Sequence, residues 1–193
     1  MGTVTAHPAD TDAPILDVLA ERWSTRVFDP TTPIDEAALA SALEAARWAP
    51  SASNTQPWRL IIGRRGTAAH AAIFDALMGF NQAWAGSASA LIVFAAETDL
   101  GAAPADWAVY DTGQAAAHFS VQAQALGLRT HQMGGFHRDR ISAAFALPAS
   151  VVPMTVMAVG VMGDPSLASE ALQAREKQPR TRREMSEIVL VTP

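Results

Sequence analysis

The stretches "RWSTRVF" (residues 22–28) and "APSASNTQPW" (residues 49–58) indicate the fold and chemistry of this chain more strongly than any other part of it. The first places the guanidinium groups of Arg22 and Arg26 four residues apart, with the hydroxyl of Ser24 between them. Arginine carries a permanent, planar charge whose paired N–H groups suit a phosphate. The second stretch offers backbone N–H groups and carboxamides but no acid or base. Together they indicate a phosphorylated, planar, hydrogen-bonding cofactor rather than a hydrolytic site.

Length and composition narrow the possible classes of protein. The 193 residues fit one domain, which we expect at residues 13–193 after a flexible N-terminal tail at residues 1–12. The net charge of −5 argues against nucleic acid as a partner, because binding it needs a basic footprint. No cysteine is present, so disulfides, thiolate nucleophiles and cysteine-ligated iron–sulfur clusters are excluded. Redox chemistry would therefore need a bound cofactor.

The compartment is inferred from what the sequence lacks. The polar N-terminus does not resemble a signal peptide. No apolar run approaches the roughly 18 residues that a membrane span needs. We therefore expect a cytoplasmic protein that does not bind a membrane.

Hydrophobic periodicity predicts a mixed α and β chain, because strand-like and helix-like segments alternate. In the segment 67–86 the inward residues are expected to be Phe74, Leu77 and Met78. The predicted helices are residues 14–22, 35–46, 67–86, 106–126, 138–146 and, more weakly, 166–178. The predicted strands are residues 59–63, 91–96, 129–132, 154–161 and 188–191.

Two basic groups could bind a phosphate, and each has a simpler explanation. Arg22, Ser24 and Arg26 could converge on one phosphate or could mark a solvated helix end. Arg180 and Arg182 could join them or could belong to a charged linker before the last strand.

Two polar segments could contact a flat ligand. Asn54 and Gln56 could hydrogen-bond the edge of a heteroaromatic ring, or could belong to an irregular turn. Gly134 and Gly135 follow a strand-like segment and would let a flat ligand approach the backbone, or could form a plain turn.

Several common sites are absent from the sequence. His131 and His137 are six residues apart without accompanying carboxylates, so no metal site is expected. There is no G-x-S-x-G nucleophile elbow, no P-loop and no G-x-G-x-x-G fingerprint. Phe80, Trp84 and Trp107 are most simply core residues, although each could face a ligand.

Taken together, the motifs resemble the FMN-dependent nitroreductase family from about residue 15 to residue 191. The resemblance rests on five features in the family's order: R-x-S-x-R-x-F, A-P-S-x-x-N-x-Q-P-W, the stretch 110–114 ("YDTGQ"), G-G-F, and a closing R-x-R-R-x-x-S-E-I-V. It implies an α+β, three-layer sandwich with a mixed, mainly antiparallel sheet flanked by helices. It also implies an intertwined homodimer with FMN at the interface, in which residues 188–191 pair with the partner's sheet.

The resemblance also implies which residues bind the cofactor. The residues expected to hold the phosphate and the N1/O2 side of the ring are Arg22, Ser24, Arg26, Arg180 and Arg182. Those expected to reach the flavin of the partner subunit are Pro50, Ser51, Ala52, Ser53, Asn54 and, from its amide, Gln56. Those expected to contact the pyrimidine edge, N5 and O4 are Asn81, Met133, Gly134 and Gly135.

The activity implied is hydride transfer from NAD(P)H to the flavin, followed by reduction of a nitroaromatic, quinone, enone or free flavin in a ping-pong sequence. The flavin N5 carries the chemistry, so no side chain is assigned as catalytic. The alternatives are an FMN-storing or FMN-sensing protein without turnover, a flavin-fragmenting or dehalogenating relative, and a cofactor-free interaction module.

Two departures from the family's pattern affect the flavin site. Many members carry a lysine near N1/O2 where this chain has Trp84. A cation there stabilises the reduced flavin, so we expect a lower flavin potential here unless Arg26 compensates. The segment 97–107 is short where larger relatives insert helices, so we expect a more open substrate site.

Overall fold

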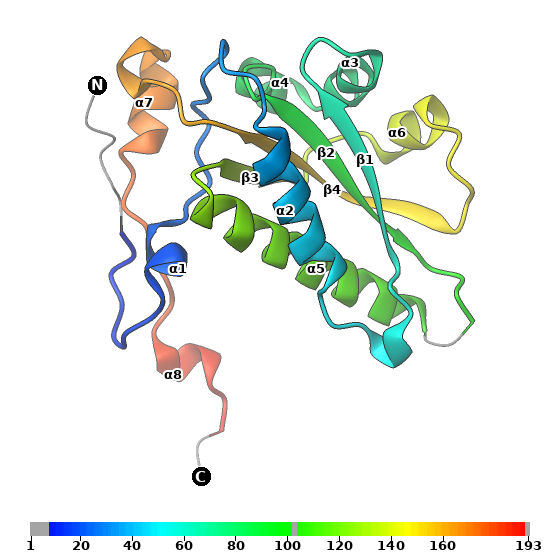
Figure 1. Cartoon of the computed structure of the whole chain (residues 1–193). Helices are drawn as coiled ribbons and strands as arrows, with labels where there is room; N and C mark the ends of the chain where they lie inside the picture. Colours follow the sequence, from blue (N-terminus) through cyan, green and yellow to red (C-terminus); the bar gives the residue numbers. More distant parts are fainter. Residues whose placement is uncertain (1–7, 102–103, 192–193) are drawn as a thin grey trace.

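The central element is a four-stranded sheet in the order β1-β2-β4-β3, with every neighbouring pair antiparallel. The computed structural model describes residues 8–101 and 104–191, and Figure 1 shows its arrangement. The strands are β1 (Trp58–Arg64), β2 (Ala90–Glu97), β3 (Arg129–Met133) and β4 (Val151–Gly160), so the four internal strands expected from the sequence are confirmed.

Strand β2 is buried on both sides, and its alternate residues face two different hydrophobic layers. Ile92 and Phe94 pack in a cluster with residues of helices α2 (Glu36–Arg47) and α5 (Ala105–Ala125). Leu91 and Val93 pack on the opposite face, in the cluster that includes residues of α3 (Ala68–Asp75), α4 (Gly79–Ala85) and α6 (Arg138–Ala144). The result is the expected three-layer α+β sandwich, and every strand pairing within the described residues is antiparallel.

The helices begin and end largely where the sequence predicts them. Helix α2 begins after Asp35, whose carboxylate accepts hydrogen bonds from the N–H groups of Ala37 and Ala38. The remaining helices are α1 (Asp17–Glu21), η1 (Ala52–Asn54), α3 (Ala68–Asp75), α4 (Gly79–Ala85), α6 (Arg138–Ala144), η2 (Pro165–Leu167), α7 (Glu170–Glu176) and α8 (Met185–Ile188).

The single helix expected over residues 67–86 was wrong, because the chain breaks between α3 and α4. Leu77 forms a β-bridge with Phe136, and the N–H of Met78 donates to the carbonyl of Gly135 at 3.0 Å. Met78 is 39% exposed rather than inward. Tertiary hydrogen bonds to the turn after β3 outweighed the local helix propensity of this alanine-rich stretch.

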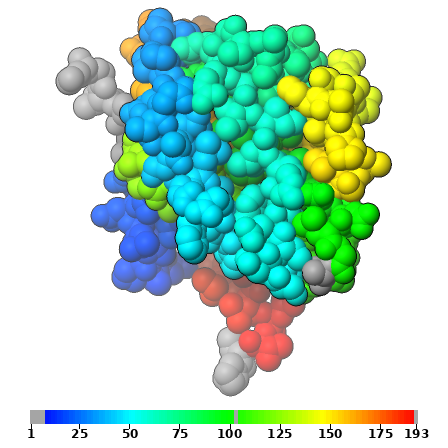
Figure 2. Space-filling model, turned by 45° about the vertical axis from the view of Figure 1, so that its right-hand side comes forward, coloured from blue at the N-terminus to red at the C-terminus, as the bar shows by residue number. Residues whose placement is uncertain are grey.

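The last strand expected, residues 188–191, does not form within the described chain. Residues 185–188 form the short helix α8, and Val189 after it is extended. Leu190 and Val191 are 88% and 84% exposed, and Figure 2 shows this C-terminal segment projecting from the body of the molecule. A strand needs a neighbour to accept its backbone hydrogen bonds, and one chain alone offers none at this place. The flexible tail expected at residues 1–12 falls mostly outside the described residues and stays a prediction.

Candidate functional site

The segment 22–28 is extended, and its side chains alternate between the protein interior and a surface pocket. Trp23, Thr25 and Val27 are buried, whereas Ser24 is exposed and Arg22 and Arg26 are half-buried. Successive side chains of an extended backbone point to opposite sides, so residues two apart share a side. The spacing R-x-S-x-R therefore brings both guanidinium groups and the hydroxyl to one face.

Arginines from both ends of the chain meet in a pocket of about 220 Å³, which we call the anion pocket. The guanidinium of Arg180 also donates to the carbonyl oxygen of Ala20 at 2.6 Å, which ties the C-terminal segment to the end of helix α1. The lining residues are Arg22, Trp23, Ser24, Arg26, Arg175, Glu176, Gln178, Arg180 and Arg182. The five predicted phosphate-binding residues are thus brought together, although the two groups are more than 150 positions apart in sequence.

The electrostatics of the anion pocket favour a negatively charged ligand. Burial lowers the pKa of Arg22, and the charges of Arg180 and Arg182 lower it further. Burial and the charge of Arg175 likewise lower the pKa of Arg26. Five guanidinium groups and one carboxylate line the pocket, so like charges repel each other there unless an anion is bound. A phosphate is one anion whose oxygens suit such paired donors.

A carboxylate and an imidazole fix the segment from its inner side. Glu176 accepts hydrogen bonds from the hydroxyl of Thr25 at 2.8 Å and the backbone N–H of Arg26 at 2.8 Å. His131 of β3 donates from Nδ1 to the carbonyl of Thr25 at 2.9 Å. Burial lowers the pKa of His131, and the charge of Arg26 adds to the effect. The sequence did not assign either residue a role, since neither lies in a recognisable motif.

The loop 50–56 lies away from the anion pocket. Figure 1 shows η1 beside the N-terminal end of α5, whereas α1 and α7 flank the opposite end of that helix. None of the predicted residues Pro50, Ser51, Ala52, Ser53, Asn54 and Gln56 lines the anion pocket. Within one chain the structure therefore does not bring the loop to the arginines.

The loop is held in an unusual backbone conformation. Ser53, Asn54 and Gln56 have positive φ angles of 51°, 56° and 49°, which non-glycine residues rarely adopt. Buried Asp111 of α5 accepts a hydrogen bond from the N–H of Ala52 at 2.8 Å. Strained backbone of this kind persists where surrounding contacts fix it, and it gathers at ligand-binding loops. This hydrogen bond joins the stretch 110–114 to the loop.

Asn81, Gly134 and Gly135 form a second local group, beside α4. The side-chain amide of buried Asn81 donates to the carbonyl of Gly135 at 2.9 Å. A Cβ on Gly135 would lie 2.8 Å from the ring of Phe80, so this glycine allows close packing. A Cβ on Gly134 would meet nothing within 4 Å, so this glycine faces open space. Buried Met133 precedes them at the end of β3. The two glycines thus differ: Gly135 packs against Phe80, whereas Gly134 leaves room for a ligand beside the backbone.

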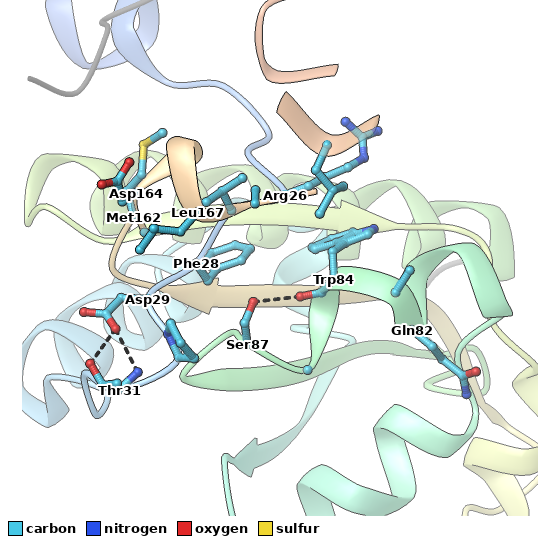
Figure 3. A pocket seen from close by; sticks show the side chains of 17 residues that line it. Arg26, Phe28, Asp29, Thr31, Gln82, Trp84, Ser87, Met162, Asp164 and Leu167 are labelled. Carbon is cyan, nitrogen blue, oxygen red and sulfur yellow. Dashed lines mark hydrogen bonds between the residues drawn. The ribbon is translucent and has the colours of Figure 1, made fainter. Parts of the chain in front are cut away.

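A larger, mainly apolar pocket of about 600 Å³ shares Arg26 with the anion pocket. Figure 3 shows the rings of Phe28 and Trp84 side by side in it; their centroids are 6.2 Å apart. Trp84 is 5% exposed, and its buried Nε1 has no hydrogen-bond partner. The sequence analysis missed the residues that complete this pocket, which include Met162, Leu167 and Leu172. Their only signal was hydrophobicity, which core residues share.

Within residues 8–101 and 104–191, no helix combines the length and the hydrophobicity that crossing a membrane requires. The same ranges hold no cluster of three or more histidine or acidic side chains suited to a metal ion.

Comparisons with known proteins agree with the geometry. A family model described as the Nitroreductase family matches residues 19–83 and 64–161. An uncharacterized 15.4 kDa protein of Mycolicibacterium smegmatis, from the ask 5′ region, is 38% identical over 137 residues, or 67% of this chain and 92% of the relative. A Bacillus subtilis protein with the provisional name NAD(P)H nitroreductase YdgI is 24% identical over 200 residues, or 81% of this chain and 92% of the relative.

Solved structures show the same fold. One described as "the oxidoreductase containing FMN" superposes with a TM-score of 0.86 at 31% identity, covering 93% of this chain and 92% of that one. A nitroreductase family protein of Clostridium difficile 630 gives a TM-score of 0.72 at 25% identity, covering 92% and 97%. Because the family model spans most of the chain and the relatives agree with it, this chain belongs to the nitroreductase family.

Proposed function

We propose that this chain is an FMN-dependent oxidoreductase that passes two electrons from NAD(P)H to a small acceptor such as a nitroaromatic, a quinone or an enone. The observation that carries the proposal is the anion pocket, in which five arginines from both ends of the chain line a space of about 220 Å³. The similar structure described as containing FMN and the Bacillus relative named for NAD(P)H support the same reading.

The residues of the anion pocket fit the phosphate of FMN. Arg22, Arg26, Arg180 and Arg182 would supply charged N–H donors, and the exposed hydroxyl of Ser24 would supply a further one. The concentration of positive charge, with five arginines and one glutamate lining the pocket, is the feature of this chain that favours a bound anion. A bound phosphate would neutralise part of this positive charge and would thereby stabilise the folded pocket.

The flavin ring would lie between the anion pocket and the turn after β3. Gly134 faces open space and would let the ring approach the backbone, and Asn81 lies beside this turn. Bound FMN supplies the chemistry by accepting a hydride and then giving two electrons to the acceptor. A single site for donor and acceptor implies ping-pong kinetics. Trp84 offers no cation near the ring, so the lower flavin potential stays a prediction for spectroelectrochemical titration.

A homodimer would complete the site. The loop 50–56 lies away from the pocket of its own chain, so it would serve the flavin of the partner. Apolar side chains are left exposed on α5 and the C-terminal segment, as expected of surfaces that a second copy covers. These include Trp107, Tyr110, Met185, Ile188, Leu190 and Val191.

The test is reduction and reoxidation of the purified protein. We expect visible flavin bands, rapid bleaching by NADH or NADPH, and recovery of the bands with menadione or a nitrofuran. Arg22→Ala should lose bound FMN and turnover together. A protein that binds FMN but oxidises no NAD(P)H would be a storage protein, and one that binds no FMN would contradict the proposal entirely.

A further inference from the structure

Glu176 is a buried carboxylate in the wall of an arginine-lined pocket. It is 9% exposed and lies at the C-terminal end of helix α7. Its Oε2 accepts from the hydroxyl of Thr25 at 2.8 Å and from the indole N–H of Trp23 at 3.3 Å, and its Oε1 accepts from the backbone N–H of Arg26 at 2.8 Å. All three donors belong to one segment, more than 145 positions away in sequence. Glu176 therefore joins α7 to the segment that carries the phosphate-binding arginines.

Two other hydrogen bonds also restrain the backbone of this segment: Nδ1 of His131 donates to the carbonyl of Thr25 at 2.9 Å, and the N–H of Gly163 donates to the carbonyl of Val27 at 3.1 Å. The segment forms no strand of the sheet, and its only β-bridge within the described residues is that of Phe28 with Met162. The hydroxyl of Thr25 also accepts a hydrogen bond from the N–H of Val27 at 3.0 Å. Through this hydroxyl, Glu176 restrains the backbone of Val27 as well as that of Arg26. On the other side of the chain Arg22 and Arg26 line the pocket.

A carboxylate in this place has two opposed effects on an anion. Its charge repels a phosphate, and removing the charge would by itself tighten phosphate binding. Its hydrogen bonds fix the segment, and removing them would loosen the arginines and weaken phosphate binding. The sign of the change in affinity therefore tells the two roles apart.

We propose that Glu176 is the positioning residue of the anion pocket, holding Trp23, Thr25 and Arg26 so that Arg22 and Arg26 face the phosphate. The proposal rests on the proposed function only for the identity of the ligand, FMN. Three hydrogen bonds converge on this one buried carboxylate, and hydrogen bonds to a charged group are stronger than those between neutral groups. Their effect on phosphate affinity should therefore exceed that of the repulsion between the carboxylate and the phosphate.

Three variants separate the roles. Glu176→Gln removes the charge and puts an amide donor either where Trp23 and Thr25 need an acceptor or where the N–H of Arg26 does. Thr25→Val keeps every charge and the side-chain size but removes the hydroxyl that Glu176 holds. Glu170→Gln removes a carboxylate from the exposed first turn of the same helix and is the matched control.

The measurement is the affinity of each apo-protein for FMN and for riboflavin, which lacks the phosphate, by fluorescence titration. We expect Glu176→Gln and Thr25→Val each to weaken FMN binding by roughly tenfold and to leave riboflavin binding within about twofold. We expect Glu170→Gln to match the wild type. The amide hydrogen of Arg26 should exchange faster in both test variants, with no ligand present.

FMN affinity equal to or tighter than that of the wild type, in either test variant, would overturn the proposal. If Glu176→Gln does not fold, Thr25→Val decides by the same criterion. Wild-type protein that binds FMN no better than riboflavin would instead contradict the proposed function. Inorganic phosphate then replaces FMN as the probe, and the same comparison of variants still tests Glu176.

Discussion

The anion pocket and the loop 50–56 carry the two strongest sequence motifs, yet they differ in whether one chain brings their predicted ligand-binding residues together. The pocket is complete within one chain, because Glu176, His131 and Arg180 tie distant segments together around it. The loop is held in shape by Asp111 but lies beside the other end of α5, away from that pocket. The comparison teaches that one chain assembles the arginine half of the proposed cofactor site but does not bring the loop to it; in the proposed homodimer a second copy would supply the loop.

The largest expected effect comes from removing an arginine of the anion pocket. Arg22→Ala should weaken FMN binding by about 100-fold, since a bidentate, charged contact to phosphate is lost. Riboflavin binding should stay within about twofold, because the ring contacts remain. Titration of both ligands measures this, with Arg140→Ala on the exposed surface of α6 as control. An equal loss for both flavins would place the phosphate elsewhere.

On the loop side, Asp111→Ala should act without discriminating between the two flavins. It leaves the N–H of Ala52 without its acceptor and should lower the unfolding free energy by about 1–3 kcal/mol. Denaturant unfolding measures the stability, and Asp106→Asn in the exposed first turn of the same helix is the control. FMN and riboflavin affinities should fall together. A selective loss of FMN would mean that the loop acts on the phosphate.

The pocket side, but not the loop, contains a histidine whose titration affects stability. Burial lowers the pKa of His131, so below its ordinary value of 6.5 the unfolded chain takes up a proton that the folded chain resists. Stability should therefore be full above pH 6.5 and fall as the pH decreases, by at most about 1.4 kcal/mol per pH unit from this group.

Denaturant unfolding between pH 5 and 7.5 measures this slope, and His131→Gln should flatten it. His70 is also buried and its pKa is lowered by burial, so His70→Gln is the parallel variant that separates the two contributions. A slope unchanged in His131→Gln would show that His131 is not the group responsible.

The smallest expected effect is at Gly134, in the turn after β3. Gly134→Ala places its Cβ in open space, so stability should change by less than about 0.5 kcal/mol. FMN and riboflavin should both bind about fivefold more weakly if the ring lies against this backbone. Unfolding and titration together measure it. Unchanged binding of both flavins would show that the ring lies elsewhere.

The sequence determined much of this protein. Hydrophobic periodicity predicted the four internal strands and most helices, because a strand such as β2 must be apolar where it is buried on both faces. The spacing R-x-S-x-R placed Arg22, Ser24 and Arg26 on one face, because an extended backbone alternates its side chains.

Only the tertiary structure decided which distant residues meet. Local pattern could not show that α3 ends where Leu77 pairs with Phe136, or that Glu176 reaches Thr25 and Arg26. Nor could it distinguish Gly135, which packs against Phe80, from Gly134, which faces open space. Such contacts depend on how the layers pack, and their hydrogen bonds join residues that have no regular spacing in sequence.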